Sequence, residues 1–416
     1  MPTSDDGGAS NAKTTTQPPR KYPFGEAEGL SLRPELAELQ SSRALARVRL
    51  PYGGDAWLAT SYEDVRAVLG DPRFSRAAAF GKDVPRLSEA INTHATILDM
   101  DPPDHTRLRR LVAMAFTPKR VEALRPRTQE IVDGLLERMA VSKPPVDLME
   151  SLAWPLPITV ICALMGVPVE DTERFRSWTD TALAVTAFSG AEIRQGMENL
   201  RSYIAGLIAE RRDTPRDDLL GAMVQARDAE DRLSENELVM FGVTLLVAGH
   251  ETTANTLGNF IYTLLTHPEQ LARLRTDPSL VPSAIEELLR YTPLSGSAGF
   301  VRIATEDVEL SGGRVRAGDA VLTETAAANR DEQAFEHAET IDIGRTNNPH
   351  LSFGHGVHYC IGAQLARMEL TIALGTLLRR FPDLALAVDA DKVEWKRGRR
   401  VRGLHSLPVT WSEVRP

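Results

Sequence analysis

The stretch FGHGVHYCIG, residues 353–362, places Cys360, one of two cysteines in the chain, among glycines and histidines. Residues 361–372 have the apolar spacing of a helix, so the pattern predicts that Cys360 lies at a helix N-terminus. Free backbone N–H groups and the positive end of the helix dipole favour a thiolate there. The glycines allow a tight turn and the close approach of a flat, bulky partner. Such a thiolate is suited to be an axial ligand of haem iron.

Cys360 considered alone has other interpretations. Many cysteines are small, buried apolar residues, as expected for Cys162 in its apolar segment. Several nearby histidines could indicate zinc, but the spacing of His358 and Cys360 differs from that of the usual ligand pairs. A cysteine hydrolase needs a general-base histidine, which His250 could supply. Nothing in the segment itself rejects the hydrolase.

A long helix is predicted between Ser234 and His267. Ser234 followed by Glu237 is a capping box, and a mixed apolar run then continues until Pro268 stops it. About thirty residues at ~1.5 Å each span roughly 50 Å, which is enough to cross a domain. Because this helix is apolar on most of its faces, we expect it to be buried centrally.

Residues 248–253, AGHETT, lie midway along this predicted helix. Gly249 costs about 1 kcal/mol relative to alanine there, which calls for a packing or functional reason. Thr252 can hydrogen-bond back to a backbone carbonyl and bend the helix. The expected result is a groove beside a hydroxyl and the carboxylate of Glu251, as dioxygen activation over iron requires. The alternative is that Gly249 only admits a crossing helix and that Glu251 faces solvent.

Helical spacing of apolar residues dominates the rest of the chain, for example in residues 117–139 and 197–211. Residues 308–316 are typical of a β-hairpin with its turn at 311–313, and another strand is expected at 320–323. The predicted class is therefore mainly α with small β-sheets.

Composition excludes several classes of protein. Lys and Arg total 48 against 57 for Asp and Glu, and this net charge of −9 argues against a nucleic-acid binder. So few cysteines exclude a disulfide framework and indicate a reducing compartment. The most apolar stretches, 156–169 and 238–248, are shorter than the ~18 residues of a membrane span. Residues 1–21 are small and polar and are expected to be disordered, which leaves 22–416 as one domain.

Taken together, these motifs resemble those of the cytochrome P450 family. The family's haem-binding loop follows the pattern Phe-Gly-x-Gly-x-His-x-Cys-x-Gly, and residues 353–362 meet every fixed position. Residues 248–253 match its Ala/Gly-Gly-x-Asp/Glu-Thr-Thr oxygen-binding motif, and residues 287–290 match its Glu-x-x-Arg motif. The resemblance covers about residues 22–415 and implies the mainly α cytochrome P450 fold, with small β-sheets, in a single domain.

The resemblance also implies roles for individual residues. Haem b would be the cofactor, with its iron bound by Cys360. Thr252 and Glu251 would act in oxygen activation, Glu251 on the proton path. Glu287 and Arg290, otherwise typical of a surface salt bridge, would pair internally with Arg345. The other expected cofactor contacts are His105, Arg109, Arg302 and His358, which match the family's propionate partners, together with Ala248, Phe353, Gly354 and Gly362.

The motifs are closest to those of actinobacterial enzymes that oxidise secondary metabolites. This resemblance implies a monooxygenase that hydroxylates or epoxidises a bulky, mostly apolar metabolite such as a macrolide or other polyketide. Dioxygen and electrons from a ferredoxin and ferredoxin reductase would be used by a cytoplasmic monomer. Small or apolar pocket walls with few fixed charges are expected, by analogy, at residues 77–96, 183–194, 241–247, 294–299 and 404–406.

Three other functions stay open from the sequence. A haem-thiolate enzyme could couple or cyclise its substrate without net insertion of oxygen, since the iron chemistry is shared. A haem-binding sensor or carrier would bind the cofactor without turnover, although Glu251 and Thr252 argue against it. A cysteine hydrolase would be colourless.

Overall fold

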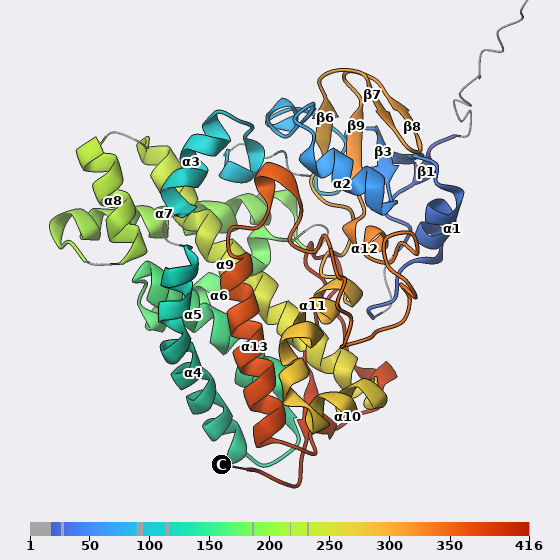
Figure 1. The fold of residues 1–416 in the computed structure, drawn as a ribbon. Coiled ribbons are helices and arrows are strands. Elements are labelled where there is room, and N and C mark those ends of the chain that lie inside the picture. Colours follow the sequence, from blue (N-terminus) through green and yellow to red (C-terminus); the bar gives the residue numbers. More distant parts are fainter. Residues whose placement is uncertain are drawn as a thin grey trace, which may run out of the picture.

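The computed structural model describes residues 18–25, 29–89, 91, 95–113, 116–184, 187–216, 218–230 and 233–415. Helices make up most of this chain, and the largest β-sheet and a hairpin gather at one side of the molecule (Figure 1). A three-stranded sheet packs separately against the helical core. The predicted mainly α class is confirmed. Residues 1–17 of the segment expected to be disordered lie outside the described residues. Regular structure begins at Arg20, two residues before the expected boundary.

The helices run in chain order from the β-rich side into the helical body and back. They are α1 (Pro34–Ser42), α2 (Tyr62–Gly70), α3 (Asp104–Ala113), α4 (Pro118–Ala140), α5 (Pro155–Met165), α6 (Thr172–Ala182), α7 (Gly190–Asp213), α8 (Leu219–Glu230), α9 (Glu235–Leu265), α10 (Pro268–Thr276), α11 (Val281–Tyr291), α12 (Thr325–Ala328) and α13 (Ala363–Arg380).

The strands form a six-stranded sheet in the order β1-β2-β3-β9-β6-β4, a three-stranded sheet β10-β11-β5 and the hairpin β7-β8. They are β1 (Arg20–Lys21), β2 (Ala46–Arg49), β3 (Asp55–Ala59), β4 (Phe74–Ser75), β5 (Val146–Asp147), β6 (Arg302–Ala304), β7 (Val308–Leu310), β8 (Gly313–Val315), β9 (Ala320–Thr323), β10 (Ala385–Leu386) and β11 (Pro408–Thr410). The prediction that Gly313 lies in the hairpin turn is wrong, because Gly313 pairs with Leu310.

Helix α9 is the predicted long central helix. The side chain of Ser234 accepts a hydrogen bond from the backbone N–H of Glu237, and the Glu237 carboxylate accepts one in return, so the capping box forms. The helix spans 31 residues and packs against α5, α7 and α13. Buried side chains occur on all its faces, which confirms its predicted place in the core.

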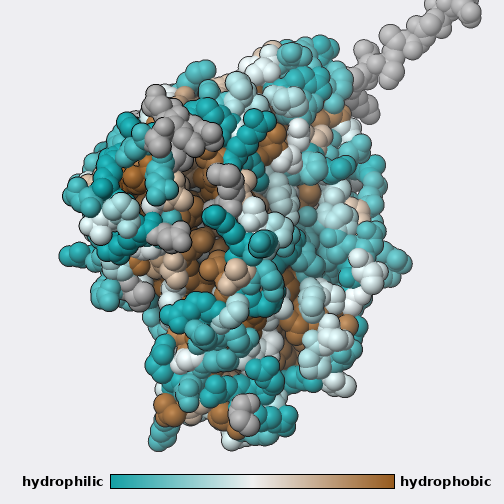
Figure 2. All heavy atoms as spheres, turned by 60° about the vertical axis from the view of Figure 1, so that its left-hand side comes forward, coloured by the Kyte–Doolittle hydropathy of each residue, from teal (hydrophilic) through white to brown (hydrophobic). Residues whose placement is uncertain are grey.

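Hydrophilic side chains cover most of the face shown in Figure 2, and hydrophobic atoms are visible mainly in the recesses between them. Within the described part of the chain, no helix combines the length and apolarity that crossing a bilayer requires.

A buried ion cluster joins α11 to the loop after α12. Glu287 accepts hydrogen bonds from Arg290 at 2.7 and 2.8 Å and from Arg345 at 3.0 Å, which confirms the expected partner. Arg290 also donates to the carbonyls of Asn329 and Ala338. Both Glu287 and Arg290 have fully buried side chains. The cluster therefore fixes the chain that leads into residues 353–362, and the surface-bridge interpretation is wrong.

Candidate active site

The loop that carries Cys360 is tightly closed. The backbone N–H of Cys360 donates to the carbonyl of Phe353 at 2.9 Å. Gly354 and Gly356 have φ of +75° and +69°, values that favour glycine. A Cβ atom on Gly356 would lie 2.7 Å from the Leu69 carbonyl oxygen, so the loop also packs directly on α2.

The predicted start of the following helix at residue 361 is wrong by two residues. Helix α13 begins at Ala363, with Gly362 as its N-cap. Cys360 consequently lies in the loop just before the helix, and the backbone N–H of Ala363 donates to the carbonyl of Cys360 at 3.4 Å. The sulfur remains close to the free end of the helix, as the sequence predicts.

The side chain of Cys360 is exposed to a cavity of about 410 Å³. Burial in the surrounding protein raises the pKa of the thiol, while a backbone hydrogen bond from Gly362 and the positive charge of Arg109 lower it. Coordination to a metal ion would remove the cost of forming the thiolate, because a coordinating thiol is deprotonated. The thiol therefore suits a ligand that enters through this cavity.

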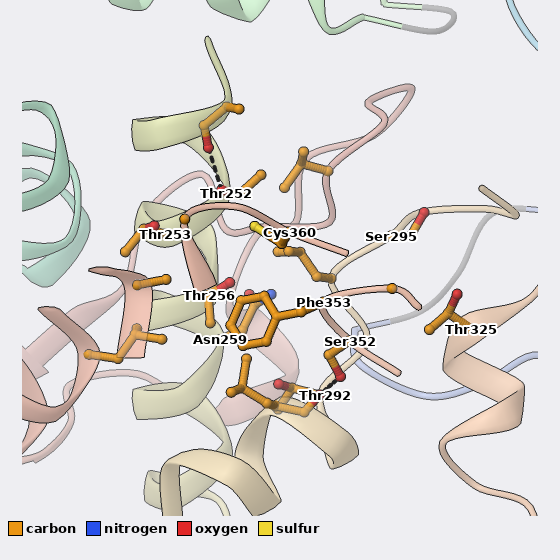
Figure 3. Close-up of a pocket in the computed structure, with 18 of the residues that line it drawn as sticks. Thr252, Thr253, Thr256, Asn259, Thr292, Ser295, Thr325, Ser352, Phe353 and Cys360 are labelled. Atoms are coloured by element: carbon orange, nitrogen blue, oxygen red, sulfur yellow. Dashed lines mark hydrogen bonds between the residues drawn. The ribbon is translucent and has the colours of Figure 1, made fainter. Parts of the chain in front are cut away.

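Helix α9 lines the same cavity, and in Figure 3 the sulfur of Cys360 points toward the side formed by Thr252 and Thr253. The hydroxyl of Thr252 donates to the carbonyl of Ala248 at 2.7 Å, the predicted bond back to the helix. A Cβ atom on Gly249 would lie 2.8 Å from two side-chain carbons of Ile161. Gly249 thus both admits helix α5 and leaves room in the cavity.

Glu251 is buried, with only 3% of its surface exposed, so the alternative that it faces solvent is wrong. One carboxylate oxygen accepts from the side-chain amide of Asn255 at 3.0 Å, and the other has no hydrogen-bond partner among the described residues. Burial raises the pKa of Glu251, while the charge of Lys396 lowers it. The carboxyl group can therefore hold a proton one residue from Thr252.

A group of buried basic side chains lies beside the Cys360 loop. The rings of His105 and His358 are 4.4 Å apart, and each has a ring nitrogen without a hydrogen-bond partner in the described chain. Burial lowers the pKa of His358 to about 3, with further effects from His105 and Arg302. Burial also lowers the pKa of Arg302 and of Arg76 to about 10.

Such a cluster is costly unless an anion compensates it. Arg302 makes one long hydrogen bond, at 3.5 Å, to the carbonyl of Phe74. Asp101 is the carboxylate that acts on both Arg302 and His358, and it already accepts hydrogen bonds from Ser75 and Arg76. The unpartnered atoms fit the carboxylates of a large anionic cofactor.

The structure sorts the predicted site residues into two sets. The cavity is lined by Ala248, Thr252, Phe353, Gly354, Cys360 and Gly362. The predicted anion partners do not line it but gather at its side. His105, His358 and Arg302 lie close together, and Arg109 donates to the carbonyl of Tyr359. These residues fit a haem whose flat ring enters the cavity and whose propionates reach the basic cluster.

Two charged residues at the site, Arg76 and Arg400, were not predicted from the sequence. Arg76 follows strand β4 and adds to the basic cluster. Its position directly after this short strand is the one local feature of the sequence that could have indicated its place in the site. Arg400 and Val401 line the cavity instead of the predicted residues 404–406, because Leu404 is buried and bridges to Trp395. Of the other predicted walls, Leu245, Leu294 and Ser295 line the cavity.

The described residues do not have the arrangement that a zinc site or a cysteine hydrolase requires. Within the described residues, no cluster of three or more potential ligands could hold a metal ion. His250 does not line the cavity to which Cys360 is exposed, and no other histidine of the described residues lines it. The imidazole is fully buried, with Nδ1 2.8 Å from the Leu246 carbonyl oxygen.

Burial lowers the pKa of His250 from 6.5 to about 4, with smaller effects from Leu246, Asp180, Arg176 and Lys396. Below pH ~6.5 the unfolded imidazole therefore binds a proton that the folded one excludes until about pH 4. As the pH falls through this window, we expect His250 to lower the free energy of unfolding by about 1.4 kcal/mol per pH unit. Urea denaturation at several pH values should show that the free energy of unfolding falls less steeply with decreasing pH in His250→Gln than in the parent. Equal slopes in both proteins would contradict the assignment.

Comparison with known proteins agrees with this geometry. A family model described as Cytochrome P450 matches residues 189–391. The chain is 50% identical to nocardicin C N-oxygenase of Nocardia uniformis subsp. tsuyamanensis, over 94% of this chain and 98% of that protein. It is 47% identical to mycinamicin IV hydroxylase/epoxidase of Micromonospora griseorubida, over 95% of this chain and all of that protein.

Solved structures give the same result. HinD with NMFT and NO has a TM-score of 0.93 and 50% identity, covering 95% of this chain and 100% of that one. The LnmA cytochrome P450 hydroxylase of Streptomyces atroolivaceus has a TM-score of 0.88 and 54% identity, covering 94% and 100%. With identity at this level over nearly its whole length, the chain belongs to the cytochrome P450 family and is a monooxygenase that uses haem b.

Proposed function

We propose that this enzyme hydroxylates or epoxidises a bulky secondary metabolite, with electrons supplied by a ferredoxin and its reductase. The observation that carries the proposal is the meeting of Cys360, Gly249 and Thr252 on one cavity. The similarity to the mycinamicin IV hydroxylase/epoxidase and to the PikC monooxygenase of Streptomyces venezuelae, 46% identical, supports a macrolide or other polyketide as the substrate.

The cofactor would be held by two groups of residues. Cys360 binds the iron, and the cavity-lining Ala248, Phe353 and Gly362 leave space for the ring. The propionates would be bound by the cations Arg109 and Arg302 and by His105 and His358 as neutral hydrogen-bond donors. When bound, haem supplies the iron at which dioxygen is reduced and from which an oxygen atom reaches the substrate.

The chain's own residues supply protons and exclude water. Thr252 holds its hydroxyl at the cavity, and the bond to Ala248 at 2.7 Å fixes its direction. Glu251 keeps a proton because burial raises its pKa, and the amide of Asn255 orients the carboxyl group. Lys396 and Asp180 lie 3.9 Å apart, and the charges of both act on Glu251. Protons therefore pass from Glu251 toward Thr252.

Reconstitution with a surrogate ferredoxin, its reductase and NADPH tests the proposal. Candidate macrolides are first screened for a low-spin to high-spin shift of the haem spectrum. A macrolide that gives this shift should stimulate NADPH oxidation and yield a product heavier by one oxygen atom. A product with no added oxygen would instead support oxidative coupling or cyclisation. Absence of ligand-dependent NADPH oxidation with every ligand that shifts the spectrum would refute the proposed activity.

Thr252→Ala should keep NADPH oxidation within about twofold of the parent but lower product formed per NADPH by about tenfold or more. Without the hydroxyl, protons are misdirected, and the electrons are expected to appear as hydrogen peroxide. Thr252→Ser, which keeps the hydroxyl, should restore the product yield. The role given to Thr252 is wrong if the alanine variant couples NADPH to product as well as the parent does.

A further inference from the structure

One charged residue in the cavity wall has no role in the chemistry described above. Among the described residues that line the cavity, the ionisable ones besides Cys360 are Arg290, Glu369 and Arg400. Arg290 is paired with Glu287. Burial raises the pKa of Glu369 well above its usual value, which keeps that carboxyl neutral. Arg400 is left as the cation of the wall.

Within the described part of the chain, no carboxylate is paired with Arg400. Among the described residues, none forms a hydrogen bond or ion pair with its guanidinium, which lies 5.0 Å from the ring centre of Phe300. Asp99 is the carboxylate whose charge acts on Arg400, but Asp99 is already paired with Arg76 at 3.2 Å. Arginine stays charged even when buried, so one residue of the cavity wall carries a positive charge.

Arg400 is also held in place. Its backbone N–H donates to the carbonyl of Leu183 at 3.2 Å, and its carbonyl accepts from the backbone N–H of Gly296 at 3.0 Å. Arg76 lies over the same Phe300 ring, 4.5 Å from its centre. Two neighbouring segments therefore fix the backbone of Arg400, and its guanidinium lies beside the Phe300 ring.

Arg400 borders the basic cluster that fits the propionates, because its charge adds to the burial that lowers the pKa of Arg76. It is not among the charges that act on Arg302. The charges that act on His358 are those of His105, Arg302, Arg76 and Asp101, and Arg400 is not among them. Its neighbours in the chain and across the bridge, Val401 and Ser295, line the cavity. Arg400 thus belongs to the part of the wall that is left for substrate.

We infer that Arg400 binds a carboxylate of the substrate, so the preferred substrate is an acid with a single negative charge. This inference rests on the proposed monooxygenase function. One unpaired cation in the described wall matches one anion, and the guanidinium fork matches the two oxygens of a carboxylate. The apolar side chains of Leu245, Leu294 and Val401 would contact the rest of the molecule. The expectation of few fixed charges in the wall is therefore incomplete.

The test uses ligands that anchor themselves on the iron. A series of ω-(imidazol-1-yl)alkanoic acids of increasing chain length is titrated into the haem-loaded enzyme, each beside its primary amide, and dissociation constants are read from the shift of the Soret band. At the length that reaches Arg400, the acid should bind about tenfold to hundredfold more tightly than the amide. This preference should fall below about twofold in Arg400→Gln and be partly kept in Arg400→Lys.

Arg379→Gln is the matched control, because Arg379 is an exposed arginine of α13 that does not line the cavity. It should keep the preference for the acid. The inference is overturned if no chain length favours the acid, or if Arg400→Gln favours it as strongly as the parent. If Arg400→Gln weakens haem binding and leaves the preference unchanged, the guanidinium serves a propionate instead. Failure of every imidazole to shift the Soret band would count against the haem site itself and so against the proposed function.

Discussion

Cys360→Ser should abolish the absorbance band at about 450 nm that the reduced enzyme gives with carbon monoxide, because that band requires a thiolate on the iron. A serine hydroxyl does not ionise near neutral pH and cannot replace the sulfur as an electron-donating ligand. The Cys360 side chain is exposed to the cavity, so the exchange removes few packing contacts. Spectra of the reduced, carbon monoxide-treated variant and its haem content give the answer directly.

Cys162→Ala is the matched control for this experiment. Cys162 is fully buried in α5, and burial raises the pKa of its thiol to about 12, so it cannot supply a thiolate. Its replacement should lower stability slightly while the 450 nm band is kept. An unchanged band in Cys360→Ser, or a lost band in Cys162→Ala with haem still bound, would contradict the assignment of the iron ligand.

Glu287→Gln should lower the free energy of unfolding by about 3–5 kcal/mol, since removing one partner of a buried ion pair leaves an uncompensated charge. Glu287 accepts from Arg290 and Arg345 and also from the backbone N–H of Asp342 at 2.8 Å. Glutamine keeps the shape but loses the negative charge that both guanidiniums share. Urea denaturation followed by circular dichroism measures the loss.

Glu122→Gln provides the comparison, because its partner Arg125 lies on the same exposed face of α4. Ion pairs of this kind contribute little to folding, so the midpoint of denaturation should hardly move. Equal stability of the two variants would show that the buried cluster is not required for the fold. If Glu287→Gln cannot be purified folded, thermal melts of Arg345→Lys and Arg345→Met measure the same cluster from its less buried partner.

Much of the fold and the site could be predicted because the relevant signals are local. The Ser234 capping box places the start of α9, and the spacing of glycines and Cys360 in one loop specifies a close approach. Arg345 could be predicted as the partner of Glu287 only through the family resemblance, since 58 residues separate them.

Features that depend on distant packing could not be predicted in this way. Arg400 lines the cavity because Leu183 and Gly296, from two remote segments, hold its backbone. The start of α13 differs from the periodic pattern because Cys360 and Gly362 close the preceding loop first. Arg76 is buried by contacts with Leu98 and Val301, and no pattern in its own segment specifies either contact.

The closed Cys360 loop has a consequence for how this enzyme could be diversified. Its backbone hydrogen bonds are made within residues 351–363, Arg109 donates to the carbonyl of Tyr359, and the loop packs against α2. The wall near Arg400 is built from residues 294–295 and 400–401. The residues proposed to hold the iron and those proposed to select the substrate are thus encoded in separate stretches of the gene. Libraries that randomise only residues 294–295 and 400–401 should yield variants that accept new substrates while they still bind haem and keep the thiolate ligand.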